Sequence, residues 1–255
     1  MPDPKLIRVY YEGDDDRVVL EGLQDCVLLP ANAEIAKRDK KHAGKDGLVH
    51  EFAAFVRPVN GASGSAIALV DLDDLNIGQR TSWFENKLAE ECKGASPPIA
   101  LVAQKSGDTR LTMFTLSSEQ GSGRVALISV GLIDNQQLRE QDGIQRFAID
   151  DHILQLVRDP RVYGAVSELE LVSHELGMRK IKEVAGQLRN NGIETRHSKR
   201  LLHILRAVAA VRPSSATFIE RLMKKAKETL SKDEIKALFH PLVADLEEAA
   251  RMLNS

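Results

Sequence analysis

The chain has 255 residues, of which 43% are hydrophobic and 28% are charged, and its formal net charge at pH 7 is −2. This length and composition predict a globular protein with a real core, made of one large domain or of a domain with an appendage. A run of about 18 apolar residues is absent, so we expect no membrane span. The first residues lack the charged and apolar regions of a signal peptide, and we expect a cytoplasmic location.

The first half of the chain alternates apolar runs with amphipathic segments. Strands are predicted at residues 7–11, 26–30, 66–71 and 97–103, and helices at residues 14–24, 48–56 and 77–92. Charge and glycine predict an exposed loop or frayed helix at residues 36–47. Alternation of this kind predicts a parallel sheet covered by helices on both faces. Apolar runs at residues 110–116 and 124–131 flank a Ser/Gly-rich turn and predict an added hairpin or edge strands.

The second half of the chain has a helical pattern. Helices are predicted at residues 151–158, 165–188, 198–211 and 217–230. Ser231 and Glu234 predict a capping box for a last helix, which Pro241 should kink or restart. The sequence therefore predicts an α/β domain over residues 1–135 and an all-helical subdomain over residues 136–255. The subdomain should pack on the sheet domain, because no long linker separates them.

Carboxylates follow two of the predicted strands. Glu12 comes after the first strand, residues 14–16 are three aspartates that open the next helix, and Asp71 and Asp73 follow the third strand. The carboxyl ends of parallel strands share one crevice, so these groups should converge. Their repulsion favours a bound divalent cation, and oxygen ligands favour Mg²⁺ or Mn²⁺ over zinc. Alternatively, the aspartates only cap a helix or begin a loop.

The run YYEGDDDRVVL, followed by DLD at residues 71–73, resembles the Toprim domain of topoisomerases, primases and overcoming-lysogenization-defect nucleases. The residues that match small stand-alone Toprim proteins are Glu12, Gly13, Asp15, Asp16 and Arg17. Asp14 replaces the usual lysine and adds negative charge beside the site. The resemblance implies a Toprim-like parallel sheet covered by helices, followed here by the C-terminal helical subdomain.

The resemblance also implies roles for individual residues. Glu12 corresponds to a general acid/base that is also a metal ligand, and Asp71 and Asp73 correspond to metal ligands. The nuclease branch uses a further acidic residue four places after the glutamate, which makes Asp16 a catalytic and metal-binding candidate. Asp15 and Asp74 are weaker candidates, as helix caps or supporting groups.

Two further candidates come from later in the chain. Two-metal enzymes need another carboxylate, and the acidic pair Asp150 and Asp151 occupies a position similar to one in small Toprim proteins; we favour Asp151 as the ligand. The alternative is a plain helix N-cap. Lys199 is the first candidate for a catalytic lysine and Lys105 the second, although lysines on helix surfaces are usually only solvated.

Positive charge is concentrated between residues 178 and 227. This segment has thirteen Lys and Arg residues against three Glu residues, a local balance of +10. Such a block suits a polyanionic partner, and the alternative is a set of solvated helical faces. The basic residues between positions 36 and 47 could likewise contact phosphates or be only solvated.

We therefore expect a metal-dependent nuclease that cleaves DNA or RNA. The chain has no nucleotide-binding P-loop, and the resemblance implies an anti-phage defence effector with an ABC-type ATPase partner. Whether the protein forms a homo-oligomer stays open. One alternative is a non-catalytic nucleic-acid-binding or assembly subunit with a degenerate Toprim fold. A haloacid-dehalogenase-type phosphatase is disfavoured, because its DxD motif follows the first strand and not the third.

Overall fold

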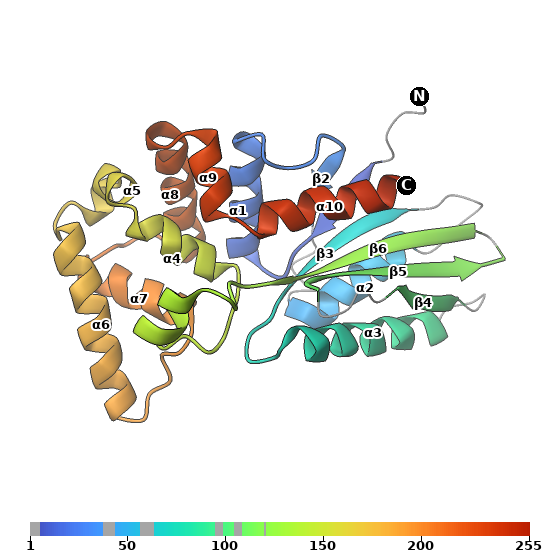
Figure 1. The fold of residues 1–255 in the computed structure, drawn as a ribbon, viewed down its shortest axis with the longest axis horizontal. Helices are drawn as coiled ribbons and strands as arrows, with labels where there is room; N and C mark the ends of the chain where they lie inside the picture. Colours follow the sequence, from blue (N-terminus) through green and yellow to red (C-terminus); the bar gives the residue numbers. More distant parts are fainter. Residues whose placement is uncertain (1–5, 38–43, 57–63, 95–98, 105–108, 120) are drawn as a thin grey trace.

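A sheet lies at one end of the molecule and a group of helices at the other (Figure 1). The computed structural model describes residues 6–37, 44–56, 64–94, 99–104, 109–119 and 121–255. The strands in these ranges are β1 (Ile7–Tyr10), β2 (Ala33–Ile35), β3 (Ser65–Asp71), β4 (Ala100–Gln104), β5 (Leu111–Ser118) and β6 (Gly121–Val130). Together they form one six-stranded sheet in the order β2-β1-β3-β6-β5-β4.

The sheet is mixed, which confirms the α/β class. The order of β4, β5 and β6 in the sheet differs from the prediction. Strands β2, β1, β3 and β6 are parallel neighbours, whereas β4 and β5 pair antiparallel. The predicted hairpin is present, but β6 is a central strand beside β3, and β4 is the edge. The reason is burial: β6 has a buried run from Val125 to Val130, whereas exposed and half-buried residues alternate along β4.

The second strand lies later than the sequence indicates. Residues 26–30 form the turn that closes the first helix, in which the Leu28 amide donates to the Leu23 carbonyl at 2.9 Å. Val27 has a left-handed backbone conformation (φ 56°) and is 72% exposed. The apolar residues here pack under the end of a helix, and the strand forms only after the chain has turned back toward β1.

The helices form two groups. Beside the sheet lie α1 (Asp14–Asp25), α2 (Gly44–Val56), α3 (Ile77–Lys93) and α10 (Leu242–Asn254). The remainder are α4 (Asp150–Arg158), α5 (Pro160–Ala165), α6 (His174–Asn190), α7 (Ser198–Val208), α8 (Ser215–Thr229) and α9 (Lys232–Leu238). Short π and 3₁₀ segments, η2 (Gln137–Gln141) and η3 (Ser167–Leu169), complete the described elements.

One helix prediction needs correction and two are confirmed. The helix predicted over residues 165–188 is divided, because Ser173 caps a new helix that begins at His174. Residues 44–47, within the segment predicted as an exposed loop or frayed helix, begin α2, and residues 38–43 lie outside the described ranges. The capping box of Ser231 and Glu234 is present, and α10 restarts after Pro241.

Each face of the sheet carries its own apolar cluster. Helices α2 and α3 cover one face, where Phe84 packs against Phe114 with ring centroids 5.3 Å apart. Helices α1 and α10 cover the other face (Figure 1). The cluster on that second face continues without interruption into the helical region, from Ile7 to Leu253. The helical region therefore packs on the sheet, as expected, and shares a core with it.

No helix in the described ranges is both long and apolar enough to cross a lipid bilayer.

Candidate active site

The carboxyl ends of β1 and β3 are tied together by a carboxylate. These strands are parallel neighbours, paired from Ile7 with Ser65 to Tyr10 with Ala68. Glu12 follows β1, and its Oε1 accepts a hydrogen bond from the Asp71 amide at 2.8 Å. The topology thus brings Glu12 and Asp71 to the same edge of the sheet.

Asp16 belongs to the same cluster and also caps its helix. Its Oδ2 accepts a hydrogen bond from the Gly13 amide at 2.7 Å, and the residue is only 8% exposed. Burial raises the pKa of Asp16 well above its ordinary value, and the charges of Asp71 and Asp150 raise it further. Asp16 therefore caps the helix and belongs to the carboxylate cluster at the same time.

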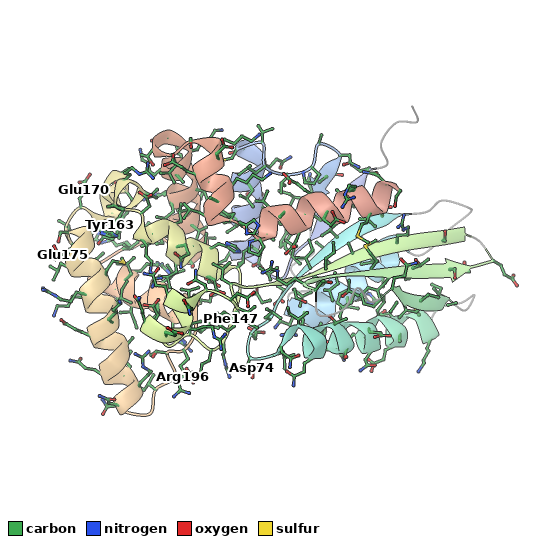
Figure 2. The ribbon with its side chains drawn as sticks, viewed as in Figure 1. Asp74, Phe147, Tyr163, Glu170, Glu175 and Arg196 are labelled. Atoms are coloured by element: carbon green, nitrogen blue, oxygen red, sulfur yellow. The ribbon has the colours of Figure 1, made fainter. Side chains whose placement is uncertain are left out.

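The segment between β6 and α4 brings a fourth carboxylate to the cluster. Gly131 follows β6 with φ +145°, and a Cβ atom there would lie 2.5 Å from Phe147 Cβ. This close approach lets Phe147 and Asp73 exchange two backbone hydrogen bonds of 2.7 Å, and the Ile149 amide donates to Asp71 Oδ1 at 3.0 Å. Figure 2 shows Phe147 at the junction between the sheet and the helices.

Asp150 and Asp151 differ sharply in their surroundings. Asp151 is fully buried, and its Oδ2 accepts from the Leu132 amide at 2.9 Å and the Ala148 amide at 3.1 Å. The Ser198 hydroxyl donates to its Oδ1. Asp150, in contrast, has a buried Oδ1 without a hydrogen-bond partner among the described residues. Asp151 therefore holds the backbone in place, and its neighbour carries the available carboxylate.

Sequence reasoning noted Asp150 but favoured Asp151. Adjacent helical residues point about 100° apart, so only one of the two can face the sheet edge. The sequence contains no signal that tells which of the two faces the sheet edge. The groups that bind both oxygens of Asp151 belong to Leu132, Ala148 and Ser198, none of which is its immediate neighbour in the chain.

The four carboxylates share unfavourable electrostatics. Burial raises the pKa of Glu12 from 4.5 to about 7; Lys45 opposes this shift and Asp16 adds to it. Burial also raises the pKa of Asp71 well above its ordinary value, with further increases from Glu12 and Asp150. The pKa of Asp150 is raised by burial as well, although Lys199 opposes the shift. Burial in a low dielectric, to which repulsion between neighbouring negative charges adds, produces this pattern.

Two cations hold Asp73 at the rim of the cluster. Lys45 forms an ion pair with Asp73 Oδ2, and its Nζ lies 3.8 Å from Glu12 Oε1. Arg80 is almost fully buried and donates to Asp73 Oδ2 at 3.2 Å and to the Leu72 carbonyl at 3.0 Å. Asp73 is thus turned toward internal cations. The sequence indicates Lys45 only as one of the basic residues between positions 36 and 47 and does not indicate Arg80, because a lysine in a charged segment and an arginine in a helix carry no distinguishing pattern.

Lys199 also reaches the cluster. Its Nζ lies 3.1 Å from Asp15 Oδ2. Burial lowers the pKa of Lys199, but Asp150 and Asp15 outweigh this effect and the net pKa is raised. Lys199 therefore stays protonated beside the acidic groups. The other lysine candidate, Lys105, lies outside the described residues.

Two histidines show contrasting placements. His197 caps α7, where its Nδ1 accepts from the Lys199 amide at 3.0 Å and its Nε2 lies 3.9 Å from Asp73 Oδ1. His152 stacks on Phe239 at 5.3 Å, and burial lowers its pKa to about 4. His152 is therefore a neutral core residue, whereas His197 borders the acidic cluster.

The donor chemistry of the cluster suits a hard cation only in part. Carboxylate oxygens are the ligands that Mg²⁺ and Mn²⁺ prefer, and Asp150 Oδ1 has no partner among the described residues. However, the described part of the chain contains no group of three His, Cys, Asp or Glu side chains arranged to hold a metal ion. The carboxylates would therefore have to rearrange to ligate one.

The basic segment does not form one uniform surface. Its cations are spread over α6, α7 and α8, and Lys180 and Lys225 form exposed pairs with nearby glutamates. Arg206 donates to the Pro213 carbonyl and lies 6.0 Å from the Phe218 ring, so it supports a turn. Lys199 and Arg200 are the exposed cations at the start of α7, next to the acidic cluster.

Comparisons with protein-family models, with curated proteins and with solved structures found no match to this chain. The likeness to Toprim proteins therefore depends only on the motif residues.

Proposed function

We propose that this protein is a metal-dependent nuclease of the Toprim type, which hydrolyses phosphodiester bonds of DNA or RNA. One observation carries the proposal: four buried or half-buried carboxylates meet at the ends of β1, β3 and the segment before α4, and all have raised pKa values. They are Glu12, Asp16, Asp71 and Asp150. Burial and mutual repulsion disfavour four charged carboxylates in one place, and a bound divalent cation would offset that repulsion.

Each polar group has a specific part in this proposal. Glu12, Asp16, Asp71 and Asp150 would hold Mg²⁺ or Mn²⁺, which when bound supplies charge neutralisation and an activated water. The pKa of Glu12 is about 7 without a metal ion, and a bound cation would lower it, so that Glu12 would ligate the ion as a carboxylate; its acid/base role comes from the resemblance to Toprim proteins. The protonated Lys199 is placed to stabilise negative charge on a phosphate.

The nucleic acid would approach over the start of α7. Lys199 and Arg200 are exposed there, and cations beside a carboxylate cluster attract phosphates that the carboxylates alone would repel. The resemblance to Toprim nucleases further suggests a role in anti-phage defence with an ABC-type ATPase partner. The role in anti-phage defence and the ATPase partner both depend only on the resemblance of the motif residues.

The proposal is tested by metal binding and by cleavage, measured separately. Calorimetry with Mg²⁺ and Mn²⁺ should show saturable binding, and plasmid, single-stranded DNA and tRNA should be tried as substrates with and without EDTA. Asp150→Asn should lose both properties. Asp25→Asn, the same exchange at the far end of α1, is the matched control. Cleavage by Asp150→Asn at the normal rate would overturn the assignment.

A second function is favoured by a different observation. Lys45 and Arg80 already neutralise Asp73, so part of the cluster has internal counter-charges and needs no metal. This arrangement suits a non-catalytic subunit that binds nucleic acid or assists assembly. Binding of nucleic acid that EDTA does not affect, without cleavage of any of the three substrates, would identify this alternative.

A further inference from the structure

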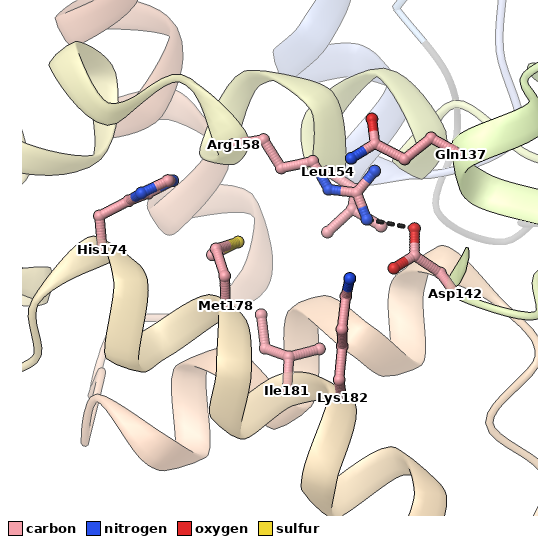
Figure 3. A pocket seen from close by; sticks show the side chains of 8 residues that line it. All are labelled: Gln137, Asp142, Leu154, Arg158, His174, Met178, Ile181 and Lys182. Atoms are coloured by element: carbon pink, nitrogen blue, oxygen red, sulfur yellow. Dashed lines mark hydrogen bonds and ion pairs between the residues drawn. The ribbon is translucent and has the colours of Figure 1, made fainter.

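A separate cavity lies in the helical region, between α4, α6 and the segment around η2 (Figure 3). Its volume is about 180 Å³. The polar side chains that line it are Gln137, Asp142, Arg158, His174 and Lys182, and the apolar ones are Leu154, Met178 and Ile181. None of these residues belongs to the acidic cluster.

The two terminal nitrogens of the Arg158 guanidinium differ in their hydrogen bonding to the described residues. Its Nη2 donates to Asp142 Oδ2, and the Asp142 side chain is 2% exposed. Its Nη1 is buried and has no acceptor among the described residues. A buried donor without an acceptor costs free energy, and a charged donor costs more than a neutral one.

Two further donors point toward the same cavity. His174 Nε2 is buried and has no partner in the described part of the chain. Lys182 extends from α6 toward Arg158 and Asp142 (Figure 3), and no described carboxylate forms an ion pair with it. Asp142 offsets one of the positive charges of Arg158 and Lys182, so the lining is positive overall.

The size and the lining restrict the ligand. The cavity volume of about 180 Å³ equals that of roughly six water molecules, at about 30 Å³ each in the liquid. This volume is larger than a free phosphate ion needs and smaller than the roughly 300 Å³ of a usual drug-sized site. Arginine and lysine donors match phosphate oxygens. Asp142 can accept from a hydroxyl group, and Leu154, Met178 and Ile181 present apolar surface to carbon atoms.

We propose that this cavity binds a small hydroxylated phosphate monoester, with its phosphate on Arg158, His174 and Lys182 and its hydroxyl groups toward Asp142. The inference goes beyond the proposed nuclease function and does not depend on it. No step of phosphodiester cleavage uses these residues.

The experiment measures binding of ribose 5-phosphate by calorimetry, with ribose and inorganic phosphate as reference probes at equal ionic strength. Saturable binding of ribose 5-phosphate and none of ribose are expected. Lys182→Glu should weaken binding about tenfold or more, because it replaces a charged donor with a repelling group. Arg179→Glu reverses a charge on the exposed face of the same helix and is the matched control, which should bind normally.

Circular dichroism and melting temperature establish that both variants fold. His174→Gln, which removes a donor without reversing a charge, gives a second and milder test. Equal affinity for inorganic phosphate would still support an anion site and would identify free phosphate as its ligand. Absence of saturable binding by either phosphate probe at millimolar concentration, or equal effects of Lys182→Glu and Arg179→Glu, would overturn the proposal.

Discussion

Helix α4 joins two regions of opposite charge. Asp150 at its first position belongs to the acidic cluster, and Arg158 at its last position lines the cationic cavity. The two residues lie roughly 12 Å apart along the helix axis. Each sign suits the helix dipole, because carboxylates are stabilised at the N-terminus and cations at the C-terminus.

The two regions differ in how their charges are compensated. In the cavity, Asp142 already pairs with Arg158, and Nη1 of the guanidinium has no acceptor among the described residues. In the acidic cluster, Lys45 and Lys199 lower the pKa values of neighbouring carboxylates, but burial outweighs this effect and the pKa values of all four stay raised. The cavity thus has an internal counter-charge for Arg158, whereas burial and mutual repulsion disfavour the charged form of the four carboxylates.

The largest effect should come from the acidic cluster. Glu12→Gln should reduce nuclease activity about 10³-fold, as expected for loss of an acid/base group. Steady-state cleavage of the best substrate measures the change. Glu170→Gln, at an exposed position far from the cluster (Figure 2), is the control and should keep full activity. Normal activity of Glu12→Gln would remove the basis for treating the cluster as an active site.

At the cavity, loss of the Arg158–Asp142 ion pair should lower the free energy of unfolding. Arg158→Met leaves Asp142 buried without its counter-ion, and removal of one partner of a buried pair costs about 3–5 kcal/mol. Urea unfolding measures this loss, and the double variant Arg158→Met, Asp142→Leu should recover most of it. Lys180→Met, which breaks an exposed pair with Glu183, should cost less than about 1 kcal/mol. A similarly small cost for Arg158→Met would show that the pair is not truly buried.

The pH dependence of stability separates the two regions. The pKa of Glu12 is about 7 in the folded protein against an ordinary 4.5, so the folded state binds more protons between these values. Its contribution is therefore complete below pH 4.5 and is lost as pH rises through 7, by at most about 3 kcal/mol.

Urea unfolding in EDTA at pH 6 and pH 8 tests this. Wild type should lose stability between the two pH values, and Glu12→Gln should lose less. The contribution of Arg158 should not change over this range, because arginine stays charged. Identical pH dependence of wild type and Glu12→Gln would contradict the raised pKa.

The smallest effect distinguishes two neighbours on α4. Asp151→Asn replaces an oxygen that accepts hydrogen bonds and should cost about 1–3 kcal/mol of unfolding free energy. Asp150→Asn removes repulsion and should leave stability unchanged or higher in EDTA. Thermal melts of both variants, with Asp25→Asn as control, measure the difference. A larger loss for Asp150→Asn would exchange the roles assigned to the two residues.

Much of the site's framework could be predicted from sequence. Strands with continuous apolar runs, such as residues 66–70, need burial on both faces, and helices with capping residues, such as the one after Ser231, begin where the side chain can satisfy free amides. Those local rules suffice to bring Glu12 and Asp71 to one edge, because parallel strands end together.

The rest depended on contacts between distant segments. Whether β4 or β6 lies beside β3 is decided by competition for the same strand edge, which the longer and more buried β6 wins. Likewise, Asp150 and not Asp151 carries the unpartnered oxygen because Leu132 and Ser198 reach Asp151 from other parts of the fold. Local sequence determines which segments are strands, helices and caps. Only tertiary packing decides which of two adjacent charges is satisfied and which is left to bind something else.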